Sequence, residues 1–151
     1  MGGYYFDEAG EIHPTGVFVV YGAPASGKTT YVKQHKKPGE LVIDLDFIKH
    51  AISFEWKTEV QKNLLNIALA MRECAYNLVE RREIECQNVW VVAGLPRREE
   101  RMSLMERLNA EMIFICTSRD ECIQRALQDD ERLDKEKQLA IINKYFDKFE
   151  P

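Results

Sequence analysis

Short apolar runs alternate along the chain with longer segments whose apolar residues recur at helical spacing. The runs are rich in β-branched residues and bounded by turn residues, which is typical of buried strands. They are residues 17–21, 41–44, 88–93 and 111–116. Helical spacing and capping signals predict helices at residues 28–35, 58–79, 97–108, 118–127 and 139–149. The charged segment 128–137 is expected to connect the last two helices.

The second predicted helix has the strongest amphipathic pattern. Thr58 and Gln61 form a capping-box sequence at its start. Its apolar residues recur on one helical face, which we expect to be buried. They are Val60, Leu64, Ile67, Ala68, Met71, Ala75, Leu78 and Val79.

The alternation of strands and helices predicts the fold class. It indicates an α/β fold, with a mainly parallel sheet covered by helices on both faces. At 151 residues, and with no repeat or linker, the chain is expected to form one domain spanning residues 1–151. Two short runs on either side of a Gly-containing turn predict an additional N-terminal hairpin at residues 4–13.

A glycine-rich loop follows the first predicted strand and precedes the first predicted helix. Its sequence fits the P-loop pattern Gly-x-x-x-x-Gly-Lys-[Ser/Thr] in the strand-to-helix context that this motif requires. A chance loop would leave Lys28 and Thr29 as an ordinary first helical turn, a reading that the context disfavours. The predicted nucleotide-binding residues are Gly22, Ala23, Pro24, Ala25, Ser26, Gly27, Lys28, Thr29 and Thr30.

The residue types of this loop suit the binding of ATP or GTP with Mg²⁺. Small residues let backbone amides surround phosphate oxygens at the positive end of a helix. Lys28 is expected to reach the β- and γ-phosphates as a catalytic residue, and Thr29 to ligate the metal.

Two carboxylates follow the second predicted strand, at the sheet edge where ligands bind in open α/β folds. Asp46 is the candidate general base, and Asp44, Asp46 and Thr29 are the candidate metal ligands. The alternative is structural, with Asp44 ending the strand and Asp46 capping a helix that begins near Phe47.

The P-loop, followed by Asp-x-Asp-x-x-Lys after a short strand, resembles the polynucleotide-kinase and zeta-toxin-like P-loop kinases. Small phage-encoded P-loop ATP-binding proteins are especially similar. The resemblance covers residues 17–132 and implies a three-layer α/β/α nucleotide-kinase-like fold with sheet order 2-3-1-4. It also implies that Asp46 is the base, that Lys49 contacts substrate phosphate, and that a lid at about residues 118–137 carries arginines.

Three arginines are candidates for phosphate binding. Arg125, as a catalytic residue, and Arg132 are predicted to clamp the donor phosphates from the lid. Arg97 directly follows the third strand and is expected to hold an acceptor phosphate. Ordinary surface pairing with nearby acidic residues explains all three arginines as well.

Composition restricts the partners. A net charge of −4 disfavours extended nucleic-acid binding. No apolar run approaches the roughly 20 residues of a membrane span, and no secretory signal is evident. We therefore expect no membrane association. The protein is expected in the cytoplasm, which is the host cytoplasm if it is phage-encoded. The four cysteines lack metal-site spacing and are expected to be reduced.

Three functions compete. The first is an enzyme, a kinase that transfers the γ-phosphate to a hydroxyl of a nucleic-acid end, a nucleoside or a small molecule. The second is an ATPase or nucleotide-dependent accessory module that acts on a protein partner in phage DNA metabolism. It is favoured because the third strand ends in Val92-Ala93-Gly94, without the acidic residue that many such kinases carry. The third is nucleotide binding without turnover.

Overall fold

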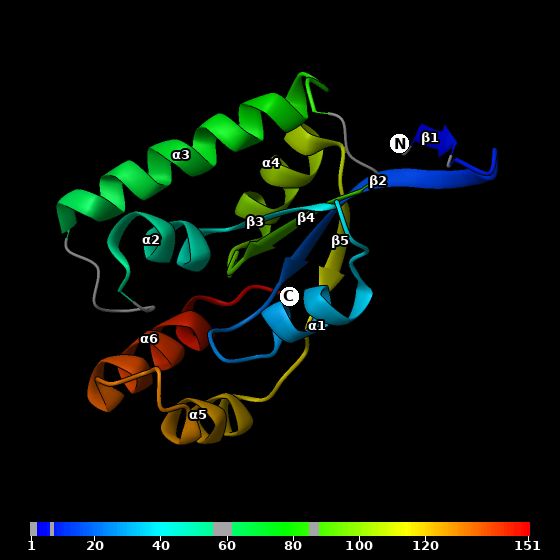
Figure 1. Cartoon of the computed structure of the whole chain (residues 1–151). Coiled ribbons are helices and arrows are strands. Elements are labelled where there is room, and N and C mark those ends of the chain that lie inside the picture. Colours follow the sequence, from blue (N-terminus) through cyan, green and yellow to red (C-terminus); the bar gives the residue numbers. More distant parts are fainter. Residues whose placement is uncertain (1–2, 7, 56–61, 85–87) are drawn as a thin grey trace.

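Four parallel strands form the centre of the computed structural model, which describes residues 3–6, 8–55, 62–84 and 88–151 (Figure 1). The strands β2 (Ile12–Tyr21), β3 (Leu41–Asp44), β4 (Asn88–Ala93) and β5 (Glu111–Phe114) lie in the order β3-β4-β2-β5. Counting the parallel strands along the chain, this is the order 2-3-1-4, so the predicted topology is confirmed.

The N-terminal strand β1 (Gly3–Phe6) pairs antiparallel with the beginning of β2. Its register places Gly3 opposite Thr15 and Phe6 opposite Ile12. Strand β2 is therefore longer than the apolar run at residues 17–21, because its first half pairs with β1 and its second half pairs with the parallel strands.

Side chains alternate across the sheet and build a separate apolar layer on each face. On one face, Val20 and Trp90 pack with Val32 of helix α1 (Lys28–His35). On the other face, Val19 and Val91 pack against helices α3 (Lys62–Glu80) and α4 (Arg98–Leu108). Strands buried on both faces explain why the sequence shows continuous apolar runs rather than alternation.

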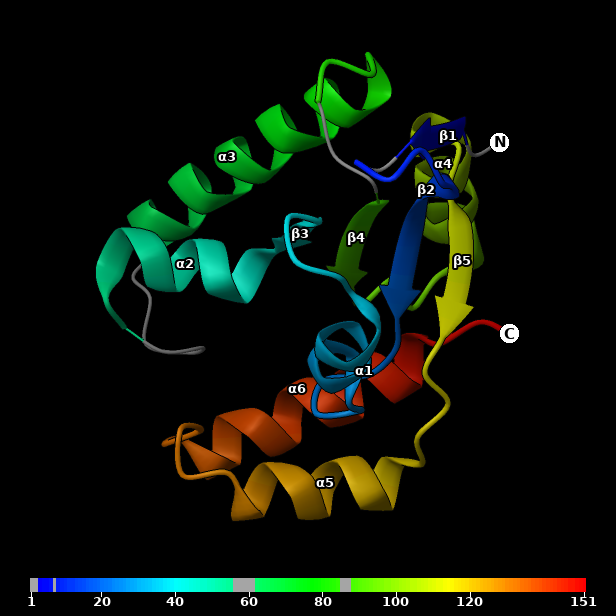
Figure 2. The same cartoon turned by 45° about the vertical axis from the view of Figure 1, so that its right-hand side comes forward.

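Three further helices surround the carboxyl ends of the strands. Helix α2 (Leu45–Ser53) follows β3 and packs against α3. Helices α5 (Arg119–Gln128) and α6 (Lys135–Lys148) pack side by side below the sheet, beneath α1 in the view of Figure 2. Their buried side chains, including Cys122 and Ile142, contact Ala23 of the glycine-rich loop.

The amphipathic face predicted for α3 is only partly buried. Ala68 and Val79 lie in the core, whereas Ile67, Met71 and Leu78 are exposed. The apolar stripe is wider than the contact area that α2 and the sheet offer, and so its outer residues face solvent. Thr58, Val60 and Gln61, which belonged to the same prediction, lie outside the described residues.

Element boundaries differ from the predictions at three places. Helix α2 begins at Leu45 rather than near Phe47. Strand β5 ends at Phe114 because the chain turns from the sheet toward α5. The connector between α5 and α6 is shorter than residues 128–137, since the Asp134 side chain caps α6 by accepting a hydrogen bond from the Lys137 amide at 3.0 Å.

None of the helices in the described ranges is long and apolar enough to cross a membrane.

Candidate functional site: a P-loop cavity at the carboxyl edge of the sheet

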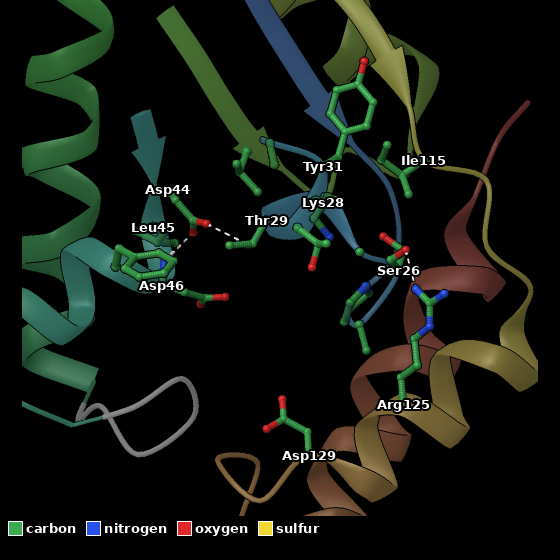
Figure 3. A pocket seen from close by; sticks show the side chains of 18 of the residues that line it. Ser26, Lys28, Thr29, Tyr31, Asp44, Leu45, Asp46, Ile115, Arg125 and Asp129 are labelled. Carbon is green, nitrogen blue, oxygen red and sulfur yellow. Dashed lines mark hydrogen bonds between the residues drawn. The ribbon is translucent and has the colours of Figure 1, made fainter. Parts of the chain in front are cut away.

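The glycine-rich loop turns between β2 and α1 at the carboxyl edge of the sheet (Figure 3). Gly22 has no room for a side chain, because a Cβ there would lie 2.8 Å from the Ile115 carbonyl oxygen. Gly27 precedes α1 with a φ of 103°, a left-handed conformation that glycine adopts at little cost. The loop conformation thus depends on the two glycines of the sequence motif.

Lys28 lies inside this loop. Its Nζ donates hydrogen bonds to the carbonyl oxygens of Gly22, at 2.9 Å, and Ala23, at 2.7 Å. Burial lowers the pKa of Lys28 to about 8, and the negative charges of Asp46 and Asp44 oppose this effect. Within the described residues, the hydrogen bonds of this ammonium group go to backbone carbonyls. Such a poorly hydrated group can bind phosphate oxygens at a small desolvation cost.

Two side chains from outside the loop hold the Ser26 carbonyl. The Thr117 hydroxyl donates to it at 2.8 Å, and Arg125 Nη1 donates to it at 2.9 Å (Figure 3). Arg125 also forms an ion pair with Glu121 at 2.6 Å. The structure therefore places Arg125 beside the P-loop and shows a contact with the loop backbone that the sequence did not predict. The role of Arg125 in a lid stays a prediction.

Asp44 links the end of β3 to the P-loop. Its Oδ2 accepts a hydrogen bond from the Thr29 hydroxyl at 3.3 Å, and its Oδ1 accepts one from the Asp46 amide at 3.0 Å. Asp44 is thus the N-cap of α2, because its carboxylate accepts a hydrogen bond from the Asp46 amide, which has no partner within the first helical turn. The alternative in which Asp46 caps this helix is wrong. Burial, with Asp46 as the next cause, raises the pKa of Asp44.

The oxygen atoms of Thr29 and Asp44 fit a magnesium site. Mg²⁺ prefers oxygen ligands and is usually bound by one or two protein groups together with substrate phosphates. Within the described ranges, no group of three or more His, Cys, Asp or Glu side chains could hold a metal ion. A protein-only metal cage is therefore not present in this part of the chain, and Thr29 with Asp44 matches the sparse pattern of a nucleotide-bound cation.

Asp46 extends into the cavity from the first turn of α2. Its side chain is 52% exposed, and its Oδ1 lies 3.5 Å from Lys49 Nζ, one helical turn further on. Unlike Asp44, Asp46 faces the open part of the cavity (Figure 3). The arrangement leaves a carboxylate accessible beside the P-loop, with a lysine next to it.

Arg132 lies on the connector between α5 and α6 and lines the same cavity. Its Nε contacts Asp129 Oδ2 at 3.2 Å, and its Nη1 donates to Gln138 Oε1 at 2.5 Å. Gln138 is almost completely buried on α6. Arg132 is thus held by two side chains at the cavity wall, and its charge contributes to lowering the pKa of Lys28.

The structure does not bring Arg97 to this site. Among the described residues, those that line the cavity do not include Arg97. The Pro96 carbonyl just before it accepts hydrogen bonds from the Glu150 amide at 2.8 Å and from Arg101 Nη1 at 3.0 Å. These contacts tie the turn to the C-terminal segment, and α4 begins there. The acceptor role of Arg97 stays a prediction, which the lining of this cavity does not support.

The cavity has a volume of about 1200 Å³. Thr30, a predicted nucleotide-binding residue, lines it together with most of the P-loop. Its walls also contain residues that the sequence analysis missed, notably Arg72, Thr117 and Gln138. Arg72 and Gln138 carried a signal, since each is a polar residue at a position that helical spacing assigns to an apolar stripe. Thr117 carried none.

Solved structures share this fold at low sequence identity. A chain in a structure of the Pnkp1/Rnl/Hen1 RNA repair complex matches with a TM-score of 0.58 and 15% identity, over 89% of this chain and 46% of that one. This chain thus spans less than half of that repair protein. A gluconokinase from Sinorhizobium meliloti matches with a TM-score of 0.55 and 15% identity, over 90% of this chain and 75% of that one.

A shikimate kinase from Acinetobacter baumannii, solved in complex with shikimate, matches with a TM-score of 0.51 and 16% identity, over 89% of this chain and 80% of that one. No curated protein gives a significant match in sequence. The AAA domain pattern matches residues 17–151, from the strand before the P-loop to the end of the given chain.

The chain thus shares the P-loop α/β fold of these kinases, with the glycine-rich loop at the carboxyl edge of the sheet. The chain belongs to the AAA domain family.

Proposed function

We propose that this domain is a kinase that transfers the γ-phosphate of ATP or GTP to a hydroxyl group. The observation that carries the proposal is the accessible Asp46 carboxylate, which shares a cavity with Lys28 and Thr29. Among the charges around Lys28, that of Asp46 has the largest effect on its pKa. A base therefore lies close to the residue that would bind the transferred phosphate.

In the proposed reaction, Asp46 accepts the proton of the acceptor hydroxyl while the hydroxyl oxygen attacks the γ-phosphorus. The bond between this phosphorus and the bridging β–γ oxygen breaks, and the nucleoside diphosphate leaves. Lys49 keeps the Asp46 carboxylate in place and is the proposed contact to the acceptor. The products are a phosphorylated acceptor and a protonated Asp46, which returns its proton to solvent.

Lys28, Arg125 and Arg132 are proposed to bind the triphosphate. Lys28 would exchange its carbonyl partners for phosphate oxygens, and the arginines would approach from the lid formed by residues 118–137. Guanidinium groups stabilise the negative charge that spreads over the phosphoryl oxygens during transfer. Mg²⁺ held by Thr29 and Asp44 would supply further neutralisation of that charge.

The main alternative is an ATPase or accessory module that acts on a protein partner. It was favoured by the missing acidic residue at the end of β4. In the structure, the Asp44 carboxylate from the neighbouring strand lies 3.3 Å from the Thr29 hydroxyl. P-loop enzymes combine such a hydroxyl with an aspartate to hold the metal. In the proposal, Asp44 supplies the acidic group that β4 lacks, which removes the objection to a kinase.

A cytoplasmic location agrees with the proposed use of nucleoside triphosphates. A phage origin, a role in phage DNA metabolism and a nucleic-acid end as acceptor stay predictions of the sequence resemblance.

The test is transfer of labelled γ-phosphate from ATP in the presence of Mg²⁺. The acceptors are 5′-hydroxyl oligonucleotides, nucleosides and polyol acids, with Lys28→Ala as the blank. Loss of the general base in Asp46→Asn is expected to slow transfer by about 10²–10⁴-fold and to leave ATP binding intact. Asp120→Asn, an exposed aspartate on α5 outside the cavity, is the matched control. Full transfer by Asp46→Asn would disprove the base assignment, and release of phosphate only to water would favour the ATPase.

A further inference from the structure

Arg72 interrupts the buried side of α3. It lies four residues after Ala68 and four before Tyr76, and both of these neighbours on the same helical face are buried. An apolar side chain at this position would continue the packed stripe at lower cost, because a guanidinium loses hydration when it is buried. The position of this arginine therefore calls for a compensating contact.

The contacts of Arg72 within the described part of the chain include an aromatic ring but no carboxylate. Its guanidinium carbon lies 5.5 Å from the centre of the Tyr76 ring. Its Nε is buried, and none of the described residues accepts a hydrogen bond from it. The adjacent Glu73 forms an ion pair with Arg107 at 2.6 Å instead. In this part of the chain, Arg72 packs on an aromatic ring but forms no ion pair, and the neighbouring Glu73 carboxylate is already bonded to Arg107.

Arg72 lines the cavity that contains the P-loop. It comes from α3, whereas Arg125 and Arg132 come from the lid segment. Helix α2, which carries Asp46 and Lys49, packs against α3, and the two helices lie side by side in Figures 1 and 2. The cavity thus has one set of cations on the lid side and a second set, Lys49 and Arg72, on the side of the proposed base.

We propose that Arg72 is a specificity residue that binds an anionic group of the acceptor, a phosphate or a carboxylate carried by the same molecule as the reacting hydroxyl. The inference rests on the proposed kinase function and names its substrate class. Lys49 divides its charge between Asp46, at 3.5 Å, and the acceptor, so Arg72 is the second cation on this side of the cavity that can bind the acceptor charge. The planar guanidinium suits both anions, because it donates two parallel hydrogen bonds to either of them.

The experiment compares acceptors that differ by one anionic group. The pairs are thymidine with thymidine 3′-phosphate, and glycerol with glycerate. Their binding to the full chain is measured by calorimetry in the presence of Mg²⁺ and a non-hydrolysable ATP analogue, and their KM and kcat are measured in the transfer assay. Because binding is measured without phosphate transfer, its result does not depend on whether the protein is a kinase.

The variants separate charge from packing. Arg72→Met keeps an aliphatic chain over Tyr76 and removes the charge, and Arg72→Lys keeps the charge without the planar group. Arg81→Met, at an exposed arginine just beyond the end of α3, is the matched control. Thermal unfolding and affinity for the ATP analogue show whether each variant keeps its fold and its donor site.

We expect the wild type and Arg81→Met to bind the anionic member of at least one pair about 10–100-fold more tightly than the neutral one, as a charged hydrogen-bond pair does. Arg72→Met should lose this preference through a higher KM, and Arg72→Lys should retain part of it. Charge preference without phosphate transfer would support the Arg72 site and reject the kinase. Phosphate transfer without a charge preference would reject the Arg72 site but not the kinase. The Arg72 site would also be rejected if the protein bound none of the anionic probes, or if Arg72→Met kept the preference of the wild type.

Discussion

Arg125 on helix α5 donates a hydrogen bond to the backbone carbonyl of Ser26 in the P-loop, at 2.9 Å and across 99 positions of the sequence. The Thr117 hydroxyl donates to the same oxygen at 2.8 Å. Helix α5 and the loop after β5 therefore share one acceptor on the P-loop. This contact connects the position of α5 to the conformation of the P-loop.

The shared acceptor predicts non-additive effects of Thr117→Val and Arg125→Met. Each single change leaves one donor on the Ser26 carbonyl, and we expect it to lower the free energy of unfolding by about 1 kcal/mol or less. The double variant leaves the carbonyl without either donor and should lose a further 0.5–1 kcal/mol, roughly. Chemical denaturation of the four proteins measures the coupling. Strictly additive losses would show that the two contacts are independent.

Gly22→Ala should damage the loop directly. The added Cβ would lie 2.8 Å from the Ile115 carbonyl and 3.0 Å from Ser26 Oγ, so the backbone would have to move. We expect a loss of about 1–3 kcal/mol in the free energy of unfolding, together with weaker ATP binding. In the control Gly16→Ala, the nearest atom to the new Cβ is at 3.5 Å, on the Phe18 ring. Equal thermal midpoints and ATP affinities for both variants would contradict the close-approach argument.

Asp44→Asn separates the capping role of this residue from its charge. Asparagine is as good an N-cap as aspartate and keeps an oxygen for the Asp46 amide, so the thermal midpoint should change little. Loss of the negative charge beside Thr29 should raise the Mg²⁺ concentration needed for half-maximal activity by about 10–100-fold. Titration of activity with Mg²⁺ checks this. An unchanged Mg²⁺ requirement would remove Asp44 from the proposed metal ligands.

The three described cysteines should differ in their reactivity. Cys74 and Cys116 are exposed, whereas Cys122 is buried against the P-loop. Burial also raises the pKa of the Cys122 thiol, and only the thiolate reacts readily. Alkylation followed by peptide mass spectrometry should therefore modify Cys74 and Cys116 first, and Cys122 only in denaturant. Fast labelling of Cys122 in the native protein would show that the packing of α5 on the loop opens readily.

Contiguous patterns determined the elements and the phosphate-binding loop. The strand from Val17 to Tyr21 was predicted because its β-branched residues are neighbours in sequence, and Lys28 and Thr29 because the motif that places them spans eight residues. The pairing of Asp44 with Thr29 was also accessible, since parallel strands bring their carboxyl ends to one edge. These features depend on short-range chemistry that the chain carries locally.

Only the tertiary structure decided which distant side chains meet. Thr117 and Arg125 reach Ser26, and Arg72 reaches the cavity, through the packing of helices far apart in sequence. Arg97 is not among the described residues that line the cavity, and the sequence could not show this, because the direction in which the chain leaves β4 depends on contacts with the C-terminal segment. Local periodicity fixes which residues share a helical face, but the partner of that face depends on how the helices pack.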